Sequence, residues 1–190
     1  MPYLSYNVDI KDSIYNAGRI ITESSANAVK IEGGTRSIES IKRIIECEIP
    51  VMGHLGLTPQ PVNMFGGYKI QGKDEKAAER IIREAKMLEE AGVFSIVLEG
   101  VPENLAAEIT KQISIPTIGI GAGKDTDGQV LVFHDMLGFN KEVPKFVKRY
   151  SNAGDEFIKS VSDYIREVKE GIFPAKENIY TVQAEIKKIY

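Results

Sequence analysis

The sequence is poor in the residues that build disulfide and zinc sites, with one cysteine, Cys47, and two histidines, His54 and His134. A single cysteine excludes an internal disulfide framework and a zinc site of several thiolates, and two histidines exclude a cluster of several imidazoles. A metal bound here would therefore be a hard cation with oxygen ligands, such as Mg²⁺, Mn²⁺ or Ca²⁺. We expect a reducing, cytoplasmic setting, where structural disulfides are rare.

Long apolar runs and an excess of one charge are also missing. No stretch is long enough to cross a bilayer, and the first residues, MPYLSYNVDIKD, do not have the form of a signal peptide. The net charge is −3, with acidic and basic residues mixed along the chain. Because there is neither a basic stripe nor a polybasic segment, we expect no nucleic acid and no membrane as a partner.

The hydrophobic residues of the sequence are numerous enough to form one hydrophobic core. The chain has 190 residues, 43% of them hydrophobic, and we expect a single domain over residues 1–190 that ends in a tail over 171–190. Apolar residues at helical spacing predict helices over 9–24, 35–46, 74–91, 102–114 and 155–169. Short apolar runs predict five strands, which end near Glu32, His54, Glu99, Ile120 and Phe133.

Strands and helices alternate along the chain, and the strands are continuously apolar. This pattern predicts an α/β fold with a parallel sheet covered by helices, either a doubly wound sheet or a β/α barrel. A complete barrel has eight strands, so five would form only part of one.

The stretch AVKIEGG places Lys30 and Glu32 two residues apart in an otherwise apolar strand. Residues two apart in a strand point to the same face, so both side chains look the same way. Glu32, His54 and Glu99 each stand where a strand ends, and in parallel α/β folds the carboxyl ends of the strands form the ligand-binding rim. The sequence therefore predicts that these polar groups share one site.

A structural and a functional interpretation stay open for each of these residues. Lys30 and Glu32 either hold a metal and a carboxylate substrate or form an internal ion pair. Glu99 is either a general base or a cap for the helix that begins near Pro102. For His54 we favour a hydrogen-bonded histidine that orders the loop after it.

Two further motifs are weaker. His134 and Asp135 are adjacent, as in a catalytic dyad, but a capping or turn role is favoured. The glycine-rich stretch over 119–123 resembles a phosphate-binding loop, yet it lacks the lysine of GxxxxGK[ST] and the full GxGxxG spacing.

Several longer stretches resemble one family: VKIEGG, VMGHLGLTPQPVNMFGGYKIQGK, IVLEGVP, IPTIGIGAGKDTDGQVLVFHDMLG and VPKFVKRY. They are similar to ketopantoate hydroxymethyltransferase (3-methyl-2-oxobutanoate hydroxymethyltransferase), in order from Met1 to about Tyr180. The second stretch is long and irregular, so chance is a poor explanation of the match.

The resemblance implies a (β/α)8 TIM barrel of the phosphoenolpyruvate/pyruvate type, assembled as a homo-oligomer, commonly a decamer. It implies a Mg²⁺-dependent transfer of a hydroxymethyl group from 5,10-methylenetetrahydrofolate to 3-methyl-2-oxobutanoate, giving 2-dehydropantoate for pantothenate synthesis. Matched by motif, Lys30 would bind the oxoacid, Glu32 would lie at the magnesium site, and Glu99 would be the proton acceptor. His54 is placed near the pocket without assigned chemistry, and the loop over 55–73 would help to exclude water.

The start of the chain resembles the segment after the family's third strand. We therefore expect a barrel truncated at its N-terminus to about five βα units. The preceding family strands carry two metal-binding aspartates and a serine that helps to bind the oxoacid. Two alternatives follow: an inactive remnant that needs a partner or the missing strands, or another 2-oxoacid carbon–carbon lyase of the same barrel type.

Overall fold

The structure is a computed structural model, and it describes residues 1–60, 67 and 69–181. The chain divides into two compact units, Met1–Leu131 and Val132–Tyr190, and each is described by itself. The single domain expected over 1–190 stays a prediction. Part of the loop expected over 55–73 lies outside the described residues, as does the end of the expected tail.

The first unit is built on a parallel sheet of five strands in the order β1-β2-β3-β4-β5. The strands are β1 (Val29–Glu32), β2 (Val51–Gly56), β3 (Ser95–Glu99), β4 (Thr117–Ile120) and β5 (Gly128–Gln129). Because the order never reverses, right-handed crossovers place every connecting helix on the same side of the sheet. A doubly wound sheet requires a reversal, so the sheet is singly wound.

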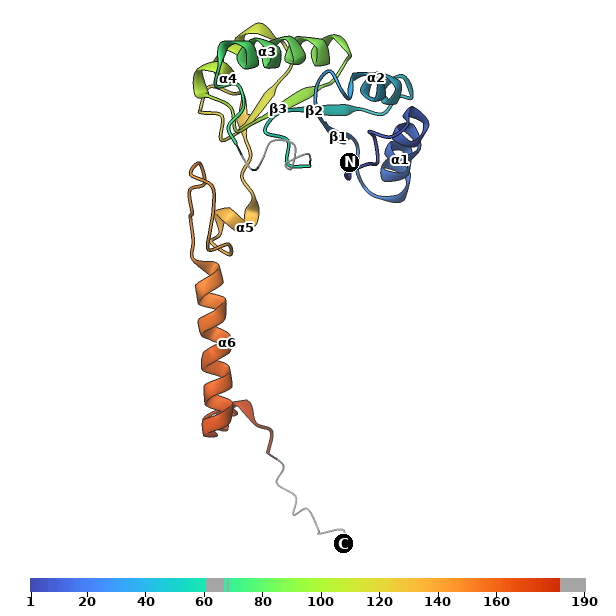
Figure 1. Cartoon of the computed structure of the whole chain (residues 1–190). Helices are drawn as coiled ribbons and strands as arrows, with labels where there is room; N and C mark the ends of the chain where they lie inside the picture. The colour runs from blue at the N-terminus through green and yellow to red at the C-terminus, as the bar shows by residue number, and fades with distance from the viewer. Residues whose placement is uncertain (61–66, 68, 182–190) are drawn as a thin grey trace. The chain divides into compact units, whose positions relative to one another are not determined.

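Four helices precede or connect these strands: α1 (Ile10–Glu23), α2 (Ile38–Glu46), α3 (Glu75–Glu90) and α4 (Glu103–Gln112). The helices α2, α3 and α4 lie along one side of the sheet (Figure 1). Asp9 and Asp74 cap α1 and α3, because each carboxylate accepts a backbone N–H of the first turn. Pro102, expected as the first residue of its helix, is instead the N-cap of α4.

The core lies between the sheet and these helices. Alternate strand residues face it and are almost fully buried, among them Ile31, Val51, Leu55, Ile96 and Leu98. Helix residues of the same cluster include Ile41, Ile44, Ile81, Leu88 and Ile109. Since side chains alternate along a strand, the polar residues between the apolar ones face away from the helices.

The fifth strand is shorter than expected. The apolar run that ends near Phe133 predicts one strand, but β5 covers only Gly128–Gln129, and Phe133–Met136 forms the short helix α5. In α5 the N–H of Met136 donates to Val132 O, which is a helical turn. A short apolar run does not distinguish a strand from a helix, so the prediction was wrong here.

The second unit consists of α5, the long helix α6 (Ala153–Glu170) and a short 3-10 turn, Lys176–Asn178. Helix α6 confirms the helix predicted over 155–169 and ends at Gly171, whose φ of 69° suits a glycine. No residue of α6 is buried. Of the helices in the described ranges, none is both long and apolar enough to cross a membrane.

Candidate active site

The carboxyl ends of β1, β2 and β3 bring the expected site residues together. Glu32 and His54 are Cα partners across β1 and β2, and Glu99 pairs with Gly56 across β2 and β3. Neighbouring partners of a parallel sheet project to the same face, so Lys30, Glu32, His54 and Glu99 all lie opposite the helix-covered face. Side chains alternate between the two faces of the sheet along VKIE, so Ile31 points into the core while Lys30 and Glu32 point to the opposite face.

His54 lies at the centre of this group, with 1% of its side chain exposed. Its Nδ1 lies 3.4 Å from Lys30 Nζ and 3.9 Å from Glu32 Oε1. Its Nε2 lies 3.2 Å from Glu99 Oε2. The imidazole, on β2, therefore lies between a cation and a carboxylate of β1 and a second carboxylate of β3.

The contact with Lys30 assigns the tautomer of His54. An ammonium group only donates hydrogen bonds, so Nδ1 accepts, and a neutral imidazole then carries its proton on Nε2. That proton faces Glu99. Although the two atoms are close, Nε2 forms no hydrogen bond with any described residue. A buried polar atom without a partner is costly, which is typical of a site completed by its substrate.

Glu32 is held by a second network, which the sequence patterns did not predict. The backbone N–H of Gln60 donates to Glu32 Oε2 at 3.1 Å, and the Tyr6 hydroxyl donates to Gln60 Oε1 at 3.0 Å. Burial, and then the nearby Glu32 carboxylate, raises the pKa of Tyr6 to about 12. The phenol therefore keeps its proton at neutral pH and remains a donor. Gln60 belongs to the irregular GHLGLTPQ stretch, and this motif could have indicated its place in the site. No sequence motif indicated Tyr6.

The structure describes the contacts on which the structural interpretations of Lys30 and Glu99 depend. Among the described residues Lys30 forms no ion pair with Glu32, and its side chain reaches His54 instead. The N-terminus of α4 has no side-chain cap, so Glu99 does not cap it. The arrangement can hold an anionic substrate at Lys30 and move a proton at Glu99. The roles assigned to single residues stay predictions.

One carboxylate of this group could serve as a metal ligand. Within the part of the chain that the structure describes, no three His, Cys, Asp or Glu side chains are placed to hold a metal ion. Mg²⁺ is commonly bound through one or two carboxylates, with water and substrate oxygens completing its shell. Glu32 fits as one such ligand.

The two weaker motifs have structural roles. The His134 ring packs edge-on against Phe133 and Phe139, with centroids 5.8 and 5.6 Å away, and Asp135 accepts a hydrogen bond from Asn140. In the glycine-rich stretch, a Cβ on Gly119 would lie 2.6 Å from Thr126 Oγ1. These glycines permit close packing of the turn after β4.

The singly wound parallel sheet and the acid–base group at its carboxyl end define the class: an α/β enzyme with its site on the strand ends. A sequence profile described as ketopantoate hydroxymethyltransferase matches residues 1–176. The chain belongs to this family, which confirms the resemblance.

Individual relatives agree. The 3-methyl-2-oxobutanoate hydroxymethyltransferase of Clostridium beijerinckii is 55% identical over 192 residues, which cover 100% of this chain and 70% of the relative. The protein of the same name from Clostridium kluyveri is 60% identical over 166 residues, covering 87% of this chain and 59% of the relative. A crystal structure of phosphonopyruvate hydrolase is 11% identical, with a TM-score of 0.49 over 94% of this chain and 63% of that one. This last likeness is too distant to carry an argument.

Proposed function

We propose that the chain transfers a hydroxymethyl group from 5,10-methylenetetrahydrofolate to 3-methyl-2-oxobutanoate, giving 2-dehydropantoate. Membership of the family and the names of the relatives support the substrates. The observation that carries the chemistry is the buried His54, which lies between Lys30 and Glu99 and beside Glu32. This arrangement suits a reaction that begins by removing a proton from an anionic oxoacid.

In the proposed mechanism Lys30 binds the oxoacid carboxylate and offsets its charge, which would otherwise be stranded in a poorly solvated site. Glu99 accepts the proton from C3, leaving an enolate. The enolate carbon bonds to the one-carbon unit of the folate, and water supplies the hydroxyl oxygen as tetrahydrofolate leaves. His54 orients Glu99 for the first of these steps.

We propose Mg²⁺ as the cofactor, with Glu32 as its ligand on this chain. When bound, the ion would withdraw charge from the carboxylate and keto oxygens of the oxoacid and make C3–H more acidic. The Gln60 N–H on Oε2 holds the Glu32 carboxylate in one orientation, which favours a ligand role.

The wider assignments follow the family. We propose that the sheet is part of a (β/α)8 barrel, supported by its sequential strand order. A homo-oligomer is supported by the exposed apolar residues of α6, among them Phe157, Val161 and Tyr164. A cytoplasmic location is supported by Cys47, an exposed free thiol.

The test is exchange of the C3 hydrogen of 3-methyl-2-oxobutanoate with D₂O, followed by NMR with and without Mg²⁺. We expect Mg²⁺-dependent exchange that Glu99→Gln lowers by at least about 100-fold, because the general base is lost. Glu90→Gln, at an exposed carboxylate of α3, is the matched control and should leave the rate unchanged.

Two results would contradict the proposal. A folded chain without any exchange would favour the inactive remnant. Exchange or cleavage with a different oxoacid alone would favour a lyase of the same barrel type.

A further inference from the structure

A cavity of about 380 Å³ opens at the carboxyl end of the sheet, close to the site just described. Its walls come from three places: the turn after β1 at Gly34–Arg36, the end of β2 at Leu55–Gly56, and helix α3 at Arg80 and Glu84. All of these segments belong to the first unit. The cavity lies outside the contacts made by His54 and belongs to none of the roles proposed above.

The cavity adjoins the reacting groups along two strands. Gly33, which also lines it, directly follows Glu32. Gly56 lines it from β2 and is the Cα partner of Glu99. A ligand that reacts beside Glu99 could therefore extend into the cavity over the ends of β1 and β2.

The charges of the cavity favour an anion. Arg80 forms no hydrogen bond or ion pair with any residue in the described ranges, although its neighbour Arg83 is paired with Glu79 at 3.4 Å. Arg36 also lines the cavity, from the turn after β1. Two guanidinium groups thus line one cavity, and guanidinium is the side chain best suited to carboxylates.

The one carboxylate in the cavity wall is already engaged. Glu84 Oε1 accepts the backbone N–H of Thr35 at 3.2 Å and its hydroxyl at 3.0 Å. Gly34 permits this contact, since a Cβ there would lie 2.6 Å from the Glu84 side chain. Glu84 therefore serves to fix the turn that carries Arg36, and in the part of the chain that the structure describes it forms no ion pair with Arg80.

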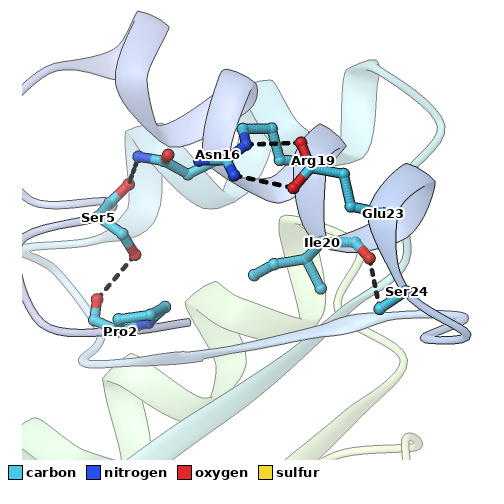
Figure 2. A pocket seen from close by; sticks show the side chains of 7 residues that line it. All are labelled: Pro2, Ser5, Asn16, Arg19, Ile20, Glu23 and Ser24. Atoms are coloured by element: carbon cyan, nitrogen blue, oxygen red, sulfur yellow. Dashed lines mark hydrogen bonds and ion pairs between the residues drawn. The ribbon is translucent and has the colours of Figure 1, made fainter.

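A second hollow provides a contrast. It lies against α1 and is lined in part by Asn16, Arg19 and Glu23 (Figure 2). Here the arginine is fully used, because Nε and Nη2 of Arg19 donate to the two oxygens of Glu23 at 2.8 Å. An arginine paired in this way has little left to offer an anionic ligand.

We propose that Arg80 and Arg36 bind the glutamate tail of the folate co-substrate. The inference rests on the proposed function and names the subsite for that substrate. In 5,10-methylenetetrahydrofolate the reacting methylene bridges N5 and N10, and one aminobenzoyl ring separates N10 from the glutamate. When the methylene lies beside Glu99, the glutamate carboxylates lie beyond the reacting groups. The cavity lined by Arg36 and Arg80 is next to that position.

The test measures binding of three probes by calorimetry: tetrahydropteroate, which has no glutamate, and tetrahydrofolate with one or three glutamates. We expect Arg80→Ala to weaken both glutamate-bearing probes by roughly fivefold to tenfold, and to leave tetrahydropteroate unchanged, because an exposed charge pair contributes modestly. The loss should shrink at high salt. Arg36→Ala should act in the same direction.

Arg83→Ala is the matched control, because it removes the same charge from the same helix but does not line the cavity. Equal weakening by Arg80→Ala and Arg83→Ala, or an equal effect on tetrahydropteroate, would overturn the subsite. C3 exchange of the oxoacid needs no folate and should be normal in Arg80→Ala. If the unmodified chain shows no exchange, the proposed function is refuted. The comparison of the three probes would still show whether Arg80 binds the glutamate tail.

Discussion

At the scale of single residues, His54 lies at the centre of the candidate site. It is a buried imidazole between Lys30 and Glu99, and its contact with the ammonium leaves the Nε2 proton facing the carboxylate. A general base works best when it is held in one orientation relative to the proton that it removes. We therefore expect His54 to position Glu99, while Tyr6 and Gln60 hold Glu32 through hydrogen bonds.

Two substitutions distinguish the contribution of Nε2 of His54 from that of Nδ1. In His54→Gln the amide nitrogen takes the place of Nε2 and keeps a donor toward Glu99, whereas in His54→Asn it takes the place of Nδ1. We expect His54→Asn to lower the C3 exchange rate by roughly 10- to 100-fold and His54→Gln to lower it much less, because misorientation of the base is what costs rate. NMR of the exchange checks this, with circular dichroism to confirm folding. Equal losses in the two variants would contradict the positioning role.

At the scale of elements, the end of β2 is the most constrained segment of the sheet. Gly56 has a φ of 93°, and a Cβ there would lie 2.2 Å from the carbonyl oxygen of Glu99. The same carbonyl accepts the N–H of Leu57 at 2.7 Å. The turn that leaves β2 is thus packed directly on the strand that carries Glu99, and only glycine fits there.

Gly56→Ala should therefore destabilise the chain by about 2 kcal/mol or more, from the left-handed backbone and the displaced carbonyl together. Gly18→Ala in α1 is the control: nothing lies within 4 Å of a Cβ there, so it should stabilise by about 0.5 kcal/mol. Urea unfolding measures both changes in the free energy of unfolding. A Gly56→Ala chain as stable as the parent would show that the end of β2 can rearrange.

At the scale of the whole molecule, α6 carries a row of exposed apolar residues. Its exposed residues include Phe157, Ile158, Val161, Tyr164, Ile165 and Val168. They recur at intervals of three and four and so form one apolar side of the helix. Contiguous apolar surface of this kind marks a place of association.

We expect Val161→Glu to lower the molar mass found by light scattering after size-exclusion chromatography, because a buried charge without a partner opposes association. Lys159→Glu introduces the same side chain two residues away, on the opposite side of the helix, and should leave the mass unchanged. If both variants and the parent chain have the monomer mass, α6 does not mediate self-association.

The sequence alone predicted much of this protein, because its signals are local. Periodicity placed α1, α3 and α6 within a residue or two of their observed bounds and placed Glu32, His54 and Glu99 at or near strand ends. The family was evident from long irregular stretches such as GHLGLTPQ, which the profile match confirms. Periodicity failed at Phe133, where a short apolar run fits a strand and a helix equally well.

Only the tertiary structure decided how these pieces meet. Alternating strands and helices suit a doubly wound and a singly wound sheet alike, and the strand order distinguishes them. The contact between His54 and Glu99 depends on the register of β2 and β3, which are far apart in the chain, and the cavity at Arg36 and Arg80 depends on the packing of α3 beside a distant turn. Distances between such residues are set by packing over the whole unit, and no local pattern encodes them.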